Sequence, residues 1–69
     1  MEQSEQWAAR ELAKHGSRES KAARLASELS FQALMADIKR PANVSARQWA
    51  ESGKGHALLI AQLEAALAA

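Results

Sequence analysis

The supply of large apolar side chains is the feature that most constrains this chain. Hydrophobic residues make up 48% of its 69 residues, but 17 of them are alanines and only 16 are larger. A chain of this length buries only about 60% of the surface that its unfolded form exposes. Cysteine is absent, so no disulfide and no thiolate metal site can stabilise the fold. The sequence therefore predicts a thinly cored protein that depends on close helix packing or on association.

The residue types favour helices. Threonine and tyrosine are absent, and the β-branched residues are limited to Ile38, Val44 and Ile60. Strands are enriched in these types, so a sheet is not expected. The longest uncharged stretch, residues 55–63, falls short of the ~20 residues of a membrane span. The N-terminus lacks the basic segment of a signal peptide, and we expect a cytoplasmic location and one helical domain over residues 1–69.

Helix-breaking residues and caps divide the chain into four expected helices, near residues 4–15, 18–39, 45–52 and 56–67. Ser4 can cap the first helix, and Gly16 is placed to end it in the left-handed conformation. Ser17 can then cap the second helix, and Pro41 follows its end. We expect an all-α fold with three to four short helices around one long helix, 18–39, and a homodimeric helical bundle.

The C-terminal third begins with a strong helix signal and contains an interruption. Ser45 and Gln48 have the spacing of a capping box, which predicts a helix start at Ser45. Each glycine of Gly53-Lys54-Gly55 costs about 1 kcal/mol inside a helix, so a break or a weakened turn is expected there. Beyond it lies a clean apolar stripe, made of Leu59, Ile60, Leu63 and Leu67.

Two apolar stripes run along the second expected helix. The first is small and smooth, and a neighbouring helix could approach it closely; it contains Ala22, Leu25, Ala26, Leu29, Ala33 and Ala36. The second is bulky and confined to the C-terminal half; it contains Phe31, Leu34, Met35 and Ile38. The bulky stripe can be core packed by the last helix, a two-fold dimer interface, or the contact for a partner's groove. We take these four residues as the candidate dimer or partner interface.

The polar residues that could carry chemistry are few. Glu11, His15 and Glu19 are spaced by four, which on one helix would suit a metal or acid–base site, but Gly16 interrupts them. A solvated surface is the favoured interpretation. His56 is expected at the polar start of the last helix. No GxSxG elbow and no phosphate-binding loop is present, so we predict no enzyme, no catalytic residues, no metal ligands and no cofactor.

A locally basic stretch offers polar contacts to a partner, from Lys14, Arg18, Lys21 and Arg24. It can be a solvated helix face, a contact for an acidic protein, or a contact for nucleic acid. Residues 25–31 resemble the first half of a helix-turn-helix, with Ala26 at the small position. Ser30 replaces the turn glycine, and the net charge of +1 gives no general basic field for nucleic acid.

The C-terminal third resembles a known family. Trp49-Ala50-Glu51-Ser52, followed by Ala57-Leu58-Leu59-Ile60-Ala61-Gln62, is similar to the end of the small quorum-sensing anti-activator proteins of Mu-like Pseudomonas phages. The resemblance covers about twenty residues, and Gly53-Lys54-Gly55 departs from the family pattern. It implies a phage-encoded helical dimer that binds a host LuxR-type transcription activator and blocks it. The family is also associated with inhibition of a type IV pilus assembly ATPase.

Two functions of different classes follow from these observations. The first is a non-enzymatic protein–protein interaction protein that binds and inhibits a host regulator. The alternative is a small dimeric helix-turn-helix-like DNA-binding regulator of a phage or plasmid. Ionic strength separates them, because duplex binding weakens steeply with salt whereas a hydrophobic protein interface barely responds.

Overall fold

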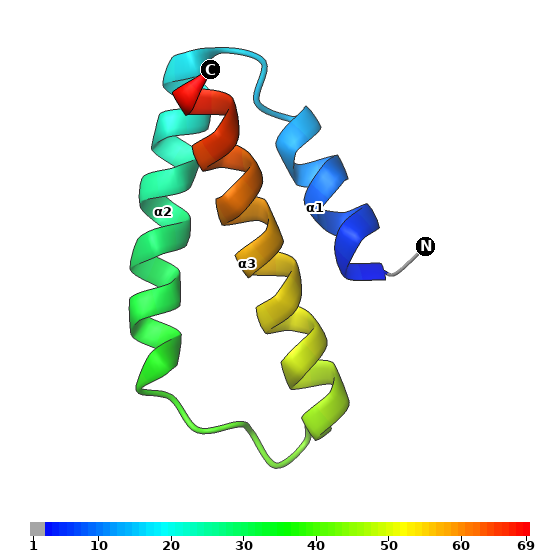
Figure 1. The fold of residues 1–69 in the computed structure, drawn as a ribbon. Coiled ribbons are helices and arrows are strands. Elements are labelled where there is room, and N and C mark those ends of the chain that lie inside the picture. The colour runs from blue at the N-terminus through cyan, green and yellow to red at the C-terminus, as the bar shows by residue number, and fades with distance from the viewer. Residues whose placement is uncertain (1–2) are drawn as a thin grey trace.

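Three helices build the protein, as a computed structural model describing residues 3–69 shows (Figure 1). They are α1 (Gln3–Ala13), α2 (Arg18–Ala36) and α3 (Ala46–Ala68). The all-α prediction is confirmed, since the described residues contain no strand. The expected arrangement around residues 18–39 is wrong, because α3 is the longest helix and lies between the other two, packing against both.

Local sequence signals correctly predict where two of the three helices begin. Ser17 caps α2, and its hydroxyl accepts a hydrogen bond from the Ser20 amide at 3.0 Å. Ser45 and Gln48 form the expected capping box at α3, with each side chain bonded to the other's backbone amide. Ser4 is not a cap. It lies inside α1, buried, and its hydroxyl donates to Glu51 of α3 at 3.3 Å.

Both α1 and α2 end earlier than expected, and in the same way. The last turns tighten, with amides bonding to the carbonyl three residues back: His15 to Leu12 at the end of α1, and Ile38 to Met35 at the end of α2. These bonds satisfy terminal carbonyls that a glycine cap would otherwise serve. The described glycines all have negative φ, so Gly16 does not adopt the expected left-handed conformation.

Of the two outcomes expected at Gly53-Lys54-Gly55, the break is wrong, since α3 is continuous through all three residues. Tertiary packing explains Gly55. A Cβ added there would lie 3.1 Å from Cε3 of the Trp7 ring, so the glycine lets α1 approach the α3 backbone closely. Contact with a large aromatic ring offsets the low helix propensity of glycine, a compensation that local sequence does not reveal.

The core is small and lies between α1 and α3. Its buried apolar residues are Ala8, Leu59, Ile60 and Leu63. Three of them belong to the stripe expected on the last helix, which is therefore confirmed, and Leu67 at its end is half-buried. Four partly buried side chains pack around this core, namely Trp7, Leu12, Leu25 and Leu58.

The apolar stripes of α2 lie differently from the expectation. Of the small stripe, only Leu25 packs against the core. Its other members are exposed, namely Ala22, Ala26, Leu29, Ala33 and Ala36. The line of α2 that faces inward carries the charged residues Arg24 and Glu28 instead, and Glu28 is only 5% exposed. The two apolar stripes therefore flank a polar inner line.

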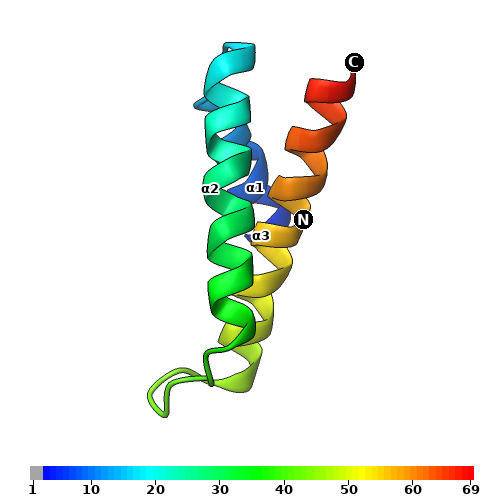
Figure 2. The ribbon, with the colours of Figure 1, turned by 90° about the vertical axis from the view of Figure 1, so that its left-hand side faces the viewer.

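The molecule is flat. Its Cα atoms span 39 × 28 × 16 Å, and the radius of gyration is 12.7 Å, against about 11 Å for a compact domain of this length. A view from the side of α2 shows α1 behind it and the C-terminal part of α3 diverging from it (Figure 2). Over residues 3–69, each helix is too short or too polar to span a membrane.

The two glycines of α3 should respond differently to alanine. Gly53→Ala should stabilise the fold by about 1 kcal/mol, because a Cβ at this position meets nothing within 4 Å and alanine favours the helix. Gly55→Ala should lose that gain, because its Cβ would press on the Trp7 ring. Urea unfolding at low micromolar concentration measures both free energies. Equal stabilisation by the two substitutions would contradict the close packing of Trp7 on Gly55.

Candidate interaction surface and its polar support

The bulky stripe of α2 is largely open to solvent. The exposed fraction is 39% for Phe31, 43% for Ile38 and 60% for Leu34, which is high for large apolar residues. Met35, the fourth member, is half-buried. The last helix therefore does not pack these side chains into the core. Ile38 lies two residues beyond the end of α2, where its amide bonds the Met35 carbonyl. We call Phe31, Leu34 and Met35, together with Ile38, the apolar flank of α2.

An open pocket adjoins this flank, between α2 and the first half of α3. Its volume is about 190 Å³. Its lining is mainly apolar and aromatic, and consists of Phe31, Gln32, Met35, Trp49, Ser52, Gly53 and His56. Two members of the apolar flank thus form one wall, while Trp49 and Gly53 come from α3. We call this the Gly53 pocket.

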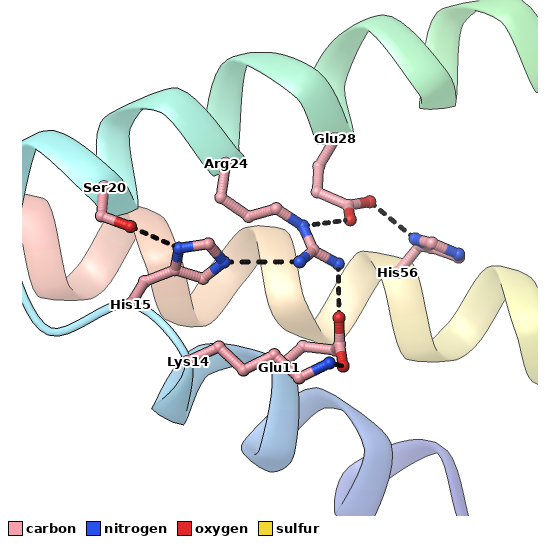
Figure 3. A network of polar contacts seen from close by, with 7 residues as sticks. All are labelled: Glu11, Lys14, His15, Ser20, Arg24, Glu28 and His56. Atoms are coloured by element: carbon pink, nitrogen blue, oxygen red, sulfur yellow. Dashed lines mark hydrogen bonds and ion pairs between the residues drawn. The ribbon is translucent and has the colours of Figure 1, made fainter.

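Arg24 is the centre of a polar cluster that joins all three helices (Figure 3). Its Nε donates to Glu28 of α2 at 2.8 Å, and its Nη2 donates to Glu11 of α1 at 2.9 Å. The second oxygen of each carboxylate is also engaged, with Lys14 at 2.6 Å from Glu11 and His56 of α3 at 2.6 Å from Glu28. The Arg24 cluster therefore links α1 and α2 through the guanidinium group, and Glu28 continues the link to α3.

His15 extends the cluster to the turn between α1 and α2. Its Nε2 lies 3.4 Å from Nη1 of Arg24, and its Nδ1 lies 2.5 Å from the Ser20 hydroxyl. Arginine can only donate, so Nε2 accepts and Nδ1 carries the proton that bonds Ser20. The side chain thus ties the end of α1 to the first turn of α2.

His56 connects the cluster to the apolar flank. Its ring lies edge-on to Trp7 of α1, with centroids 4.6 Å apart, and its centroid is 4.7 Å from that of Phe31. The hydrogen bond that its Nδ1 donates to the Glu28 carboxylate holds the ring between these two aromatic side chains. The expected polar helix start is wrong, because α3 is continuous and places His56 in its interior, half-buried.

The basic stretch is not a free cationic surface. Lys14 pairs with Glu11, and Lys21 donates to the Gly16 carbonyl at 3.4 Å. Arg18 hydrogen-bonds the Leu67 carbonyl of α3. Arg24 is enclosed by two carboxylates. The helix-turn-helix interpretation also lacks its turn, because α2 is continuous through Ser30.

The three residues spaced by four, Glu11, His15 and Glu19, do not lie together in the structure. Glu11 and His15 both contact Arg24, so the solvated-surface interpretation is wrong for them, whereas Glu19 is exposed. Within residues 3–69, no group of three His, Cys, Asp or Glu side chains is placed to hold a metal ion. The four-residue spacing of Arg24 and Glu28 was the available signal for the cluster, since such pairs meet on one helix face.

The charges of the cluster reinforce one another. Hydrogen bonds from Lys14 and from Arg24 lower the pKa of Glu11 below its usual value. Burial opposes the charge of Arg24, but the hydrogen bonds to Glu28 and Glu11 outweigh that effect and raise the pKa of the guanidinium. The guanidinium of Arg24 therefore keeps its charge, and each of its nitrogens bonds a side chain of the cluster.

Removing the charge of Arg24 should destabilise the protein strongly. Arg24→Met should cost about 3 kcal/mol, because it leaves the buried carboxylate of Glu28 without its cation. The double variant Arg24→Met/Glu28→Met should recover most of this loss, because no buried charge is then left unpaired. Helicity measured by circular dichroism during urea unfolding gives the three free energies. A double variant as unstable as the single one would contradict the role given to the ion pair.

Acid should weaken the fold through Glu11. Its pKa is lower in the folded protein than in the unfolded chain, where it is about 4.3. The carboxylate therefore contributes stability above that value, and the contribution is lost as the pH falls through the folded-state pKa. The unfolding free energy should fall between about pH 5 and pH 3. Glu11→Gln should lose part of this dependence, and an identical pH profile for both proteins would count against the interpretation.

The comparisons with known proteins leave the family open. No protein-family model, no characterised protein and no solved structure matches this chain. The features of the molecule that indicate a function are therefore the exposed apolar flank of α2, the Gly53 pocket beside it and the Arg24 cluster that supports both.

Proposed function

We propose that this chain is a small, non-enzymatic protein–protein interaction protein whose working surface is the apolar flank of α2. The observation that carries the proposal is the exposure of Phe31 and Leu34 on α2 and of Ile38 just beyond its end. Scattered apolar residues are normal on a protein surface, but a contiguous apolar patch marks an interaction site. Met35 adds an adaptable side chain, which suits binding to a partner surface.

The polar groups of the protein support a binding role over a catalytic one. Both oxygens of Glu11 and of Glu28 form bonds within the chain, and each nitrogen of the Arg24 guanidinium also has a partner there. These groups hold helices together and position Phe31 through the ring of His56. The Gly53 pocket beside them is lined mainly by apolar and aromatic side chains, which suits an apolar group of a partner.

The partner we propose is a host regulatory protein, in the first instance a LuxR-type transcription activator that the chain binds and inhibits in the cytoplasm of the host. This identification follows the resemblance of the C-terminal third to phage anti-activators. Two residues of the resembling stretch, Trp49 and Ser52, line the Gly53 pocket next to the apolar flank. The resemblance therefore includes positions on the proposed surface as well as buried ones such as Leu59.

A binding assay with matched substitutions tests the surface. Leu34→Glu should weaken capture of a purified LuxR-type activator at least tenfold, because a carboxylate would enter a desolvated contact. Leu29→Glu is the control, since Leu29 is also exposed on α2 but belongs to the other stripe, and this variant should bind like the wild type. Equal binding by all three proteins would remove the apolar flank from the proposal.

The same assay separates a protein partner from DNA. Binding to a hydrophobic protein surface should change little between 50 and 200 mM salt, whereas binding to duplex DNA with several phosphate contacts would fall by orders of magnitude. A steep salt dependence with DNA, together with no capture of the activator, would favour the DNA-binding alternative.

A further inference from the structure

Nothing within the folded chain explains why position 53 is a glycine. Glycine inside a helix is unfavourable, and at Gly55 the Trp7 ring accounts for it. At Gly53, an added Cβ would meet nothing within 4 Å, so the folded chain does not require the missing side chain. Gly53 nevertheless lines the pocket beside the apolar flank. Its absent side chain leaves room there for a group that comes from outside.

The size and lining of the pocket fit one large apolar side chain. Its volume of about 190 Å³ is similar to the ~150 Å³ of an apolar cavity that accepts benzene. Phe31 and Met35 form the α2 side, and Trp49 faces them from α3. A leucine or isoleucine inserted here would contact aromatic rings and the bare backbone at Gly53.

The protein also exposes more surface than a folded monomer of its mass. Its accessible surface is 4893 Å² for 7.5 kDa, which exceeds the typical value for a folded monomer by about 640 Å². A standard protein interface buries about 800 Å² on each partner. The surplus is therefore close to the area that one copy of a small dimer would bury.

The apolar flank is suited to its own copy. Leu34, its most exposed member, directly precedes Met35 of the pocket wall, so the inserting side chain and the receiving pocket share one stretch of α2. Residues 29–36 carry no charge, so two copies of this stretch can meet without like-charge repulsion. A surface that both inserts and receives is self-complementary, which is the requirement of a two-fold interface.

We propose that two copies of the chain pair through the apolar flank of α2, with Leu34 of each copy seated in the Gly53 pocket of the other. This inference rests on the proposed function, because the second copy of the chain would bind the same apolar flank of α2. The pair would then bind a regulator as a dimer. Gly53 is the residue that opens the pocket, and Leu34 is the residue that fills it.

Sedimentation equilibrium on the wild type, Gly53→Leu, Leu34→Glu and Leu29→Glu tests the pairing. The wild type should show twice its chain mass of 7.5 kDa at tens of micromolar, and its melting temperature should rise with concentration. Gly53→Leu should fill the pocket from within and weaken dimerisation at least thirtyfold, as expected for a central interface residue. Leu34→Glu should do the same, and Leu29→Glu should dimerise like the wild type.

The Gly53→Leu variant tests dimerisation without disturbing the fold of the single chain. Its side chain begins in open space and leucine favours the helix, so the variant should remain as helical as the wild type at low concentration. A monomeric wild type at several hundred micromolar would overturn the proposal, as would Gly53→Leu dimerising at wild-type strength. If the wild type is monomeric but Leu34→Glu still loses the activator, the pairing fails while the proposed function stands.

Discussion

The guanidinium of Arg24 is the interaction on which the arrangement of the three helices depends. It bonds directly to Glu11 of α1 and to Glu28 of α2, and Glu28 in turn bonds His56 of α3. A buried ion pair contributes little net stability, because desolvation offsets much of the attraction, but breaking it is costly. The cluster therefore selects one arrangement of the helices over others more than it adds to the total stability. With four buried apolar residues in the described part of the chain, the protein has few other means of selecting one arrangement.

Placing charges on the inner line of α2 has a consequence for its outer surface. The positions that face α3 are occupied by Arg24 and Glu28, so most large apolar residues of α2 lie to either side of that line. Leu29 lies on one side, Phe31 and Leu34 lie on the other, and Ile38 follows just beyond the end of the helix. Their exposure follows from the polar interior rather than from a failure of packing. The helix thus presents apolar surface outward while remaining attached to the fold.

Those parts of the structure that depend on neighbouring residues could be predicted from the sequence. The caps at Ser17 and Ser45 are local hydrogen bonds, and the stripe of α3 follows from helical periodicity. The continuity of α3 could not be predicted, because it depends on Trp7, nearly fifty residues away, packing on Gly55. The polar inner line of α2 was missed for a related reason. Apolar periodicity assumes that the buried face is apolar, and here an ion pair replaces it.

The proposed surface and the polar cluster are physically connected. Phe31 belongs to the apolar flank and to the wall of the Gly53 pocket, and it also contacts the ring of His56. That ring is held by the carboxylate of Glu28, which Arg24 holds in turn. Phe31, the aromatic member of the apolar flank, is therefore linked through His56 to the ion pair of Glu28 and Arg24. A surface supported in this way is pre-organised, so that a partner need not order Phe31 on binding, and less of the interaction free energy is lost to side-chain entropy.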